Sequence, residues 1–115
     1  MPRPSRKLTV DLHGHDARTA FDLARIRVAE AWRNGYGEVE LVHGAAYVPT
    51  PGGPRGKIKF GLRRMVEDGD FDAFIDKTRT WIRTDAIVLY LKPNPRAVRQ
   101  QWSPAPRRAY DQRPR

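Results

Sequence analysis

The sequence predicts a small α/β domain with two layers, and three segments carry this prediction. Residues 7–13 and 38–43 alternate apolar and polar side chains, as half-buried strands do, and a segment with helical periodicity separates them. Residues 86–91 (AIVLYL) are apolar throughout but too short for a helix, which indicates a buried strand. A chain of 115 residues has room for one core, so one mixed sheet with helices packed against it accounts for the pattern.

The first helix is expected at residues 16–34, between the first two strands. Asp16 is a suitable N-cap, apolar residues recur at helical spacing through the segment, and Gly35 follows it. A strand, a helix and a strand of these lengths form a right-handed parallel crossover by default. The first two strands should therefore be parallel and end at the same edge of the sheet.

The second half of the chain is less regular. Residues 45–56 are rich in proline and glycine and are expected to form a surface loop. Residues 57–68 have the spacing of an amphipathic helix, which Gly69 closes. Residues 70–83 remain open between two interpretations, because their apolar positions fit a helix while the run at 71–75 (FDAFI) also fits a strand.

Most of the formal net charge of +9 lies at the two ends of the chain. Residues 1–7 contribute +3, and residues 93–115, with six arginines against Asp111, contribute +5. The segment between them holds 13 basic and 12 acidic side chains, a net +1. We therefore expect flexible basic ends, residues 1–6 and 93–115, on a folded domain that spans residues 7–92.

Basic ends of this kind favour contact with a polyanion, because an arginine beside a phosphate releases counterions and adds affinity without sequence preference. Trp102 and Tyr110 are interleaved with the arginines and are suited to stacking on bases. We therefore expect RNA, DNA or the ribosome as partner. The alternative is that the ends serve only solubility.

Cysteine is absent, which excludes a disulfide framework, a thiolate metal site and a cysteine nucleophile. The basic N-terminus is followed by no apolar run, so we expect neither a secretory signal nor a membrane anchor and place the protein in the cytoplasm. The oligomeric state leaves no mark in the sequence.

All three histidines follow predicted strands at their carboxyl ends. Asp11, His13 and His15 stand in VDLHGH, and His43 stands in LVHG. The crevice beyond the carboxyl ends of parallel strands is where α/β sheets bind ligands, so these four side chains should converge on one cleft. Histidine exchanges protons near neutral pH and an aspartate can orient it, which suits phosphodiester chemistry. The alternative is that Asp11 caps the loop backbone and the histidines are ordinary surface groups.

A phosphate-binding surface is predicted beside these histidines. Gly14 and Gly44 each follow a histidine directly and permit close approach of the backbone to a ligand. The second helix begins with a glycine and a lysine, which offer backbone amides, a helix dipole and a cation to a phosphate. The residues predicted to bind nucleic acid or phosphate are Gly14, His15, Gly44, Arg55, Gly56, Lys57 and Lys59.

Three motifs resemble those of the Smr (small MutS-related) domain, which occurs at the C-terminus of some MutS-like proteins and as free-standing bacterial proteins. VDLHGH at 10–15 resembles the family's Leu-Asp-Leu-His-Gly, and LVHG at 41–44 resembles the start of its His-Gly-x-Gly. GKIK at 56–59 is similar to the family's Gly-x-Leu-Arg/Lys. The resemblance covers residues 7–92.

The resemblance implies a β-α-β-α-β-β fold similar to the C-terminal domain of bacterial translation initiation factor three, with endonuclease activity on RNA or DNA. It also favours a strand at 71–75 and a loop over 77–85. The chain departs from the family at HGAA, where Ala46 replaces the last glycine, and in several extra residues before Gly56. This departure puts catalysis in more doubt than binding.

These observations predict an endonuclease whose catalytic residues are Asp11, His13 and His43. One histidine deprotonates the 2′-OH of RNA while the other protonates the leaving 5′-oxygen, and Asp11 orients one of them. Lys57 and Arg55 stabilise the charge on the phosphorane. The scheme requires no metal or other cofactor, and Mg²⁺ or Mn²⁺ on Asp11 and a histidine is an alternative. The rival interpretation, supported by HGAA, is a non-catalytic adaptor that grips RNA or a ribosome.

Overall fold

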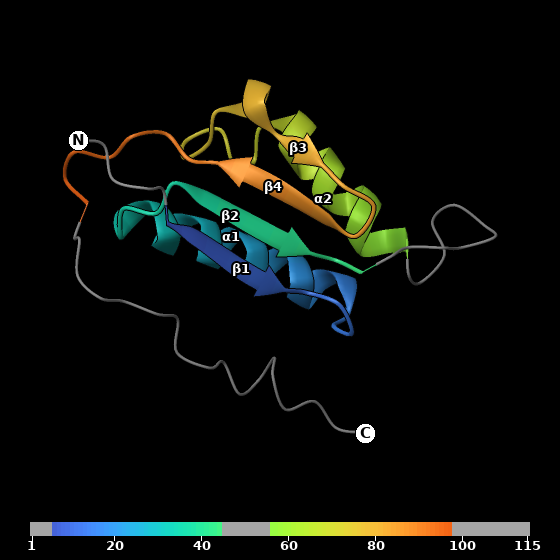
Figure 1. Cartoon of the computed structure of the whole chain (residues 1–115). Helices are drawn as coiled ribbons and strands as arrows, with labels where there is room; N and C mark the ends of the chain where they lie inside the picture. Colours follow the sequence, from blue (N-terminus) through green and yellow to red (C-terminus); the bar gives the residue numbers. More distant parts are fainter. Residues whose placement is uncertain (1–5, 45–55, 98–115) are drawn as a thin grey trace.

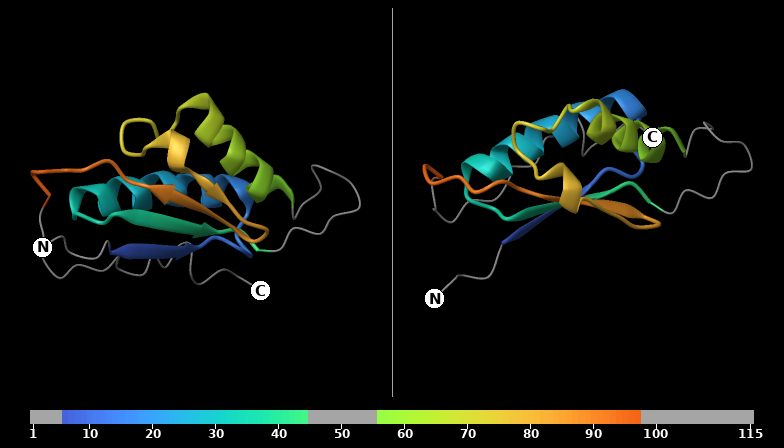
Figure 2. Two further views of the ribbon diagram at one scale, coloured as in Figure 1. Left: turned by 45° about the horizontal axis from the view of Figure 1, so that its top comes forward. Right: turned by 90° about the horizontal axis from the view of Figure 1, so that it is seen from above.

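A computed structural model describes residues 6–44 and 56–97 as one mixed four-stranded sheet with two helices on one of its faces (Figures 1 and 2). The elements follow in the order β1 (Lys7–Asp11), α1 (Ala17–Arg33), β2 (Glu38–Val42), α2 (Gly56–Asp68), a 3₁₀ helix (Lys77–Arg79), β3 (Trp81–Ile82) and β4 (Ala86–Tyr90). Across the sheet the strand order is β1-β2-β4-β3. The predicted class, a small α/β domain with a mixed sheet that includes a parallel pair, is confirmed.

The strand–helix–strand unit forms as its sequence predicts. β1 and β2 are parallel and in register from Lys7 with Glu38 to Asp11 with Val42. Between them, α1 begins after Asp16, whose side chain accepts a hydrogen bond from the Thr19 N–H at 3.1 Å. This cap satisfies one of the free backbone donors of the first helical turn. β1 and β2 consequently end at the same edge of the sheet.

The core lies between the sheet and the two helices. It takes alternate residues of β1, β2 and β4 and one face of each helix; the largest fully buried side chains are Leu12, Val28, Val39, Leu41, Leu62, Phe71, Ile75, Ile87 and Leu89. The two helices approach closely at Gly61, where a Cβ atom would overlap the ring of Phe21. A glycine at this position lets the Phe21 ring lie against the backbone of α2.

The segment 70–83 matches neither of the two interpretations that its sequence left open. The expected strand at 71–75 is wrong: Phe71 O accepts hydrogen bonds from the N–H groups of Phe74 and Ile75, at 2.9 and 3.1 Å, which makes a single turn. The turn buries Phe71 and Ile75 together. A strand would also place residues four apart on one face, so it is the two hydrogen bonds, and not this spacing, that exclude the strand. A continuous helix is wrong as well, because the turn ends at Ile75, which makes one bridge to Leu91.

The third strand is instead β3, within the segment 77–85 that was expected to be a loop. Trp81 pairs with Val88 and Ile82 pairs with Ile87 of β4. The Arg83 N–H donates to Ala86 O at 2.8 Å and closes the tight turn that brings the two strands together. The order β-α-β-α-β-β is therefore present, with its third strand about ten residues later than expected.

Both ends of the described chain are held to the domain. Arg6, expected in the flexible N-terminus, accepts hydrogen bonds from Gly37 and Glu38 through its carbonyl oxygen, and its guanidinium lies 4.1 Å from the centre of the Tyr36 ring. At the other end, Asn94 Nδ2 donates to Trp32 O at 3.0 Å. Residues 1–5 and 98–115, which include Trp102 and Tyr110, lie outside the described residues. No helix of the described part is long and apolar enough to cross a membrane.

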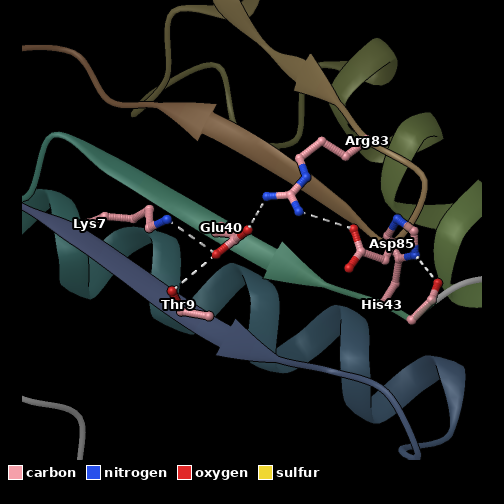
Figure 3. Close-up of polar contacts among 7 residues, drawn as sticks. Lys7, Thr9, Glu40, His43, Arg83 and Asp85 are labelled. Atoms are coloured by element: carbon pink, nitrogen blue, oxygen red, sulfur yellow. Dashed lines mark hydrogen bonds and ion pairs between the residues drawn. The ribbon is translucent and has the colours of Figure 1, made fainter.

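On the sheet face away from the helices, Glu40 binds side chains from two neighbouring segments (Figure 3). Its carboxylate accepts hydrogen bonds from Thr9 Oγ1 of β1 at 3.2 Å and from Arg83 Nη1, just after β3, at 2.7 Å. Lys7 Nζ lies 3.5 Å away. Only 11% of the Glu40 side chain is exposed, so these partners replace the water that the carboxylate loses. Glu40 thereby ties β1, β2 and the β3–β4 turn together.

We expect Glu40→Ala to lower the free energy of unfolding by about 2 kcal/mol, the scale of a buried carboxylate with charge-assisted hydrogen bonds, reduced because Arg83 is partly exposed. Denaturant unfolding measures the loss. Glu67→Ala, which removes an exposed carboxylate on α2, is the matched control and should change stability by less than about 0.5 kcal/mol. Equal losses in the two variants would contradict the tie assigned to Glu40.

Candidate functional site

Asp11 and His13 form a hydrogen-bonded pair where β1 ends. Asp11 Oδ1 lies 2.7 Å from His13 Nδ1 and also accepts the His13 backbone N–H at 3.1 Å. A carboxylate only accepts hydrogen bonds, so Nδ1 carries the proton in this pair and Nε2 is left to accept one. The side chains are 61% and 67% exposed, respectively. The arrangement presents an oriented imidazole at the surface.

The turn after β1 places this pair at the edge of the sheet. The Leu12 N–H still donates to Val42 O at 2.7 Å, so the chain remains beside β2 for one residue beyond the strand. Gly14 then adopts a φ of +84°, a conformation that glycine tolerates best, and the chain turns toward the start of α1. The half-buried His15 lies in this turn, where its N–H donates to Leu12 O at 3.4 Å.

His43 has a different environment, because only 5% of its surface is exposed. Its Nδ1 lies 2.8 Å from Gly44 O and donates to it, so Nε2 is the ring's acceptor nitrogen. This buried nitrogen has no hydrogen-bond partner among the residues that the structure describes. Burial lowers the pKa of His43 below its ordinary value of 6.5, and the cations Lys59 and Arg63 lower it further.

The parallel strands bring the two histidine segments together, as predicted, but give the two rings different surroundings. Asp11 pairs with Val42, so the next residues along the strands set Leu12 beside His43 and His13 beside Gly44. Leu12 and His43 are buried, whereas Asp11 and His13 are exposed. A Cβ atom on Gly44, whose φ is +87°, would lie 3.3 Å from His13 Cβ. His43 is therefore linked to the exposed pair indirectly: it bonds to the backbone of Gly44, and Gly44 lies beside His13.

The predicted phosphate-binding residues that the structure describes lie in three places, which are the turn after β1, the end of β2 at Gly44 and the start of α2. Gly56 is the first residue of α2, Lys57 is exposed and Lys59 is half-buried. Arg55, with the rest of the loop at 45–55, lies outside the described residues. Further along α2, Arg63 and Arg64 add two cations that the sequence interpretation did not single out, although their spacing from Lys59 and Phe60 is helical.

Asp11, His13 and His43 line neither of two hollows on the described surface. The larger, of about 770 Å³, is lined by Tyr36, Arg79, Tyr90 and Lys92 among others, at the opposite end of the sheet. A second, of about 420 Å³, adjoins it. The side chains of Asp11 and His13 are instead exposed to solvent. Within residues 6–44 and 56–97, no three histidine or carboxylate side chains are grouped so as to hold a metal ion.

No family model matches this chain, and no curated protein and no solved structure matches it either. The class that the structure itself defines is a small mixed-sheet α/β domain with an exposed aspartate–histidine pair at one edge of the sheet.

The buried His43 predicts a pH-dependent term in stability. Because its pKa is lower in the folded protein than in the unfolded chain, the unfolded chain binds the proton first as the pH falls. The stabilisation is complete above pH 6.5 and is lost as the pH falls below 6.5 toward the folded pKa. We expect the difference in free energy of unfolding between the wild type and His43→Gln to shrink between pH 7.5 and pH 5. A difference that stays constant, or grows as the pH falls, would contradict the buried neutral imidazole.

Proposed function

We propose that this protein is an endonuclease of the Smr type that cleaves phosphodiester bonds in RNA or in structured DNA. The observation that supports it best is the 2.7 Å contact between Asp11 Oδ1 and His13 Nδ1, which orients an exposed ring with Nε2 available. Both side chains are more than half exposed, which leaves them accessible to a nucleotide polymer. The proposed partner is nucleic acid, free or within a ribosome.

In the proposed mechanism His13 is the general base. Its Nε2 takes the proton of a ribose 2′-OH, O2′ attacks phosphorus, and the 5′-oxygen leaves with a proton from solvent. Asp11 holds the ring by the Nδ1 hydrogen bond and stabilises the imidazolium that forms. This step leaves a 2′,3′-cyclic phosphate and a 5′-hydroxyl.

His43 takes a positioning role in this scheme. A histidine whose pKa is lowered by burial is neutral near neutral pH and carries one ring proton, which His43 donates from Nδ1 to Gly44 O. Its Nε2 therefore has no proton for the leaving group. Its Nδ1 instead fixes Gly44 O, and Gly44 lies against His13. Loss of His43 should therefore lower the rate of cleavage by displacing His13.

The fold supports the same family. The order β-α-β-α-β-β is the one that the Smr resemblance implied, and it occurs here with a parallel first pair and both helices on one face of the sheet. The motif VDLHGH ends β1, and LVHG ends β2 beside it. We extend the proposal to a likeness with the C-terminal domain of bacterial translation initiation factor three.

The competing candidate is a nucleic-acid- or ribosome-binding adaptor without catalysis. It is favoured by HGAA, which lacks the second glycine of the family motif, and by the burial of His43. An adaptor would bind nucleic acid through the exposed basic side chains, and it would not require an imidazole oriented for catalysis.

The products of the reaction test the proposed mechanism. RNA should be cut to a 2′,3′-cyclic phosphate, and the same RNA with one 2′-deoxyribose at the cleavage position should resist cleavage there. Mass spectrometry of the fragments identifies the end groups. Fragments with a 5′-phosphate, or cleavage at the deoxyribose, would instead mean that water is the nucleophile and would remove the 2′-OH step assigned to His13.

A further inference from the structure

The side of α2 that faces solvent combines one exposed aromatic ring with four cations. The core side of the helix is apolar, with Ile58, Leu62, Met65 and Val66 all buried. On the helical projection the opposite side is centred on Phe60, which is 43% exposed. Around it lie Lys57, Lys59, Arg63 and Arg64, and we refer to these five residues as the basic-aromatic face.

The cations of this face make no ion pair with a carboxylate within the described residues, and the acidic residues of α2, Glu67 and Asp68, come only in its last turn. Elsewhere on the domain, basic side chains lie beside acidic ones, as Lys7 lies beside Glu40 and Arg27 beside Glu30. Within the described residues, no ion pair involves any of the four cations of the basic-aromatic face. No acidic residue occurs between Gly56 and Val66. Positive charge concentrated in this way attracts a polyanion.

The aromatic ring at the centre of the face favours single-stranded nucleic acid over other polyanions. Lys59 Nζ and Arg63 Cζ lie over the Phe60 ring, 5.9 and 5.8 Å from its centre. A base that stacks on the ring takes the place of one of these cations, whose long side chain then meets a neighbouring phosphate. Surfaces that bind single strands pair aromatic rings with basic groups in this way, because every base has a face that can stack. In a duplex the bases are already stacked on one another, and the ring would find no partner.

The N-terminal end of the face lies on the same side of the domain as the strand end that carries His43. Lys59 and Arg63 act electrostatically on His43, which is bonded to Gly44, and Gly44 lies against His13. In Figure 1 the first turn of α2 lies beside the edge where β2 ends and the β3–β4 turn begins. A strand bound along α2 would therefore approach the edge of the sheet that carries His13.

We propose that the basic-aromatic face of α2 binds an unpaired segment of nucleic acid, with one base stacked on Phe60 and the neighbouring phosphates on Lys59, Arg63 and Arg64. The inference rests on the proposed nucleic-acid function for its class of ligand, but it does not require cleavage. It assigns the substrate class as single-stranded and adds Phe60, Arg63 and Arg64 to the binding residues.

Binding of the full chain to a fluorescent 20-nucleotide oligo(dT), which lacks the 2′-OH, tests the role of the ring. We expect Phe60→Ala to weaken binding by about tenfold, the scale of one lost stacking contact, while Phe60→Trp keeps the affinity. Trp81→Ala is the matched control, since Trp81 is 56% exposed on β3 and should leave binding unchanged. Binding to a duplex of equal length should be insensitive to Phe60→Ala.

The cations are tested by the salt dependence of the same binding. Arg63→Ala and Arg64→Ala should each reduce the slope of log affinity against log salt by about 0.7, whereas Arg33→Ala, at the exposed end of α1, should not. The inference is overturned if Phe60→Ala binds oligo(dT) like the wild type, if Trp81→Ala loses as much, or if duplex affinity falls equally. A wild type that binds through Phe60 but cuts nothing sinks the nuclease and supports this surface. If the wild type cuts nucleic acid and Phe60→Ala binds normally, the nuclease proposal is supported and the binding surface on α2 is ruled out.

Discussion

Asp11→Asn should lower the rate of RNA cleavage by about a hundredfold or more, the scale of losing one acid–base participant. An amide in place of the carboxylate no longer accepts the Nδ1 proton as a charged partner and no longer stabilises the imidazolium. Affinity for the same RNA should stay constant or rise slightly, because one negative charge leaves a surface that meets phosphate. Single-turnover cleavage and equilibrium binding measure the two effects separately.

Asp72→Asn is the control for this substitution, since Asp72 is an exposed aspartate that lines the hollow at the opposite end of the sheet. It should cleave like the wild type. If Asp11→Asn cuts as fast as the wild type, the activity stands and the assignment of its residues is wrong. If Asp11→Asn loses binding and cleavage together, Asp11 supports the turn before α1 and not the chemical step.

Deletion of residues 96–115 should weaken binding to nucleic acid and flatten its salt dependence while leaving the domain folded. The deletion removes six arginines and Asp111, which is five of the nine net positive charges. If all of these charges meet phosphates, the slope of log affinity against log salt becomes shallower by up to about 3.5 for a single strand. The truncated chain keeps Asn94 and its hydrogen bond to Trp32 O, so its melting temperature should hardly change.

A full-length variant with the six arginines changed to glutamine separates charge from chain length. It should show the same flattened salt dependence as the truncation. An unfolded truncated chain would mean that residues 96–115 pack against the core. Unchanged binding in both variants would mean that the C-terminal end serves solubility and not contact with nucleic acid.

Local sequence patterns predicted the first half of the fold because each pattern fits only one type of secondary structure. Apolar and polar residues alternate in residues 7–13 and 38–43, and the segment between them has an N-cap at Asp16 and helical periodicity. This order predicts a parallel crossover, and the structure contains it. The structure of segment 70–83 was harder to predict because its apolar residues fit both the helical and the strand periodicity. Phe71 and Ile75 are buried by a single turn, whereas the strand β3 is two exposed residues, Trp81 and Ile82, with no alternation to read.

The candidate site was predicted in part for a similar reason. The spacing in VDLHGH places Asp11 two residues before His13, on the same side of the chain, and the two side chains are in contact. The same period-two rule, applied across the β1–β2 register, sets His43 beside Leu12 rather than beside His13. The order of the motifs does not reveal that His43 pairs with the residue before His13. This offset of one residue in the register decides whether the two histidines face the same surface. Phe60 was missed because only the apolar side of the amphipathic helix was considered, and Phe60 lies on the other side.

The most direct test of the account is whether the purified wild-type protein cuts nucleic acid. Labelled RNA and branched DNA are incubated with it from pH 5 to pH 8, with and without Mg²⁺ or Mn²⁺, and with Asp11→Asn and His13→Ala in parallel. The account predicts that the wild type cuts RNA, or structured DNA, and that both variants bind but are severely impaired in cutting. A wild-type protein that binds both substrates and cuts neither under any of these conditions would contradict it and identify the protein as an adaptor.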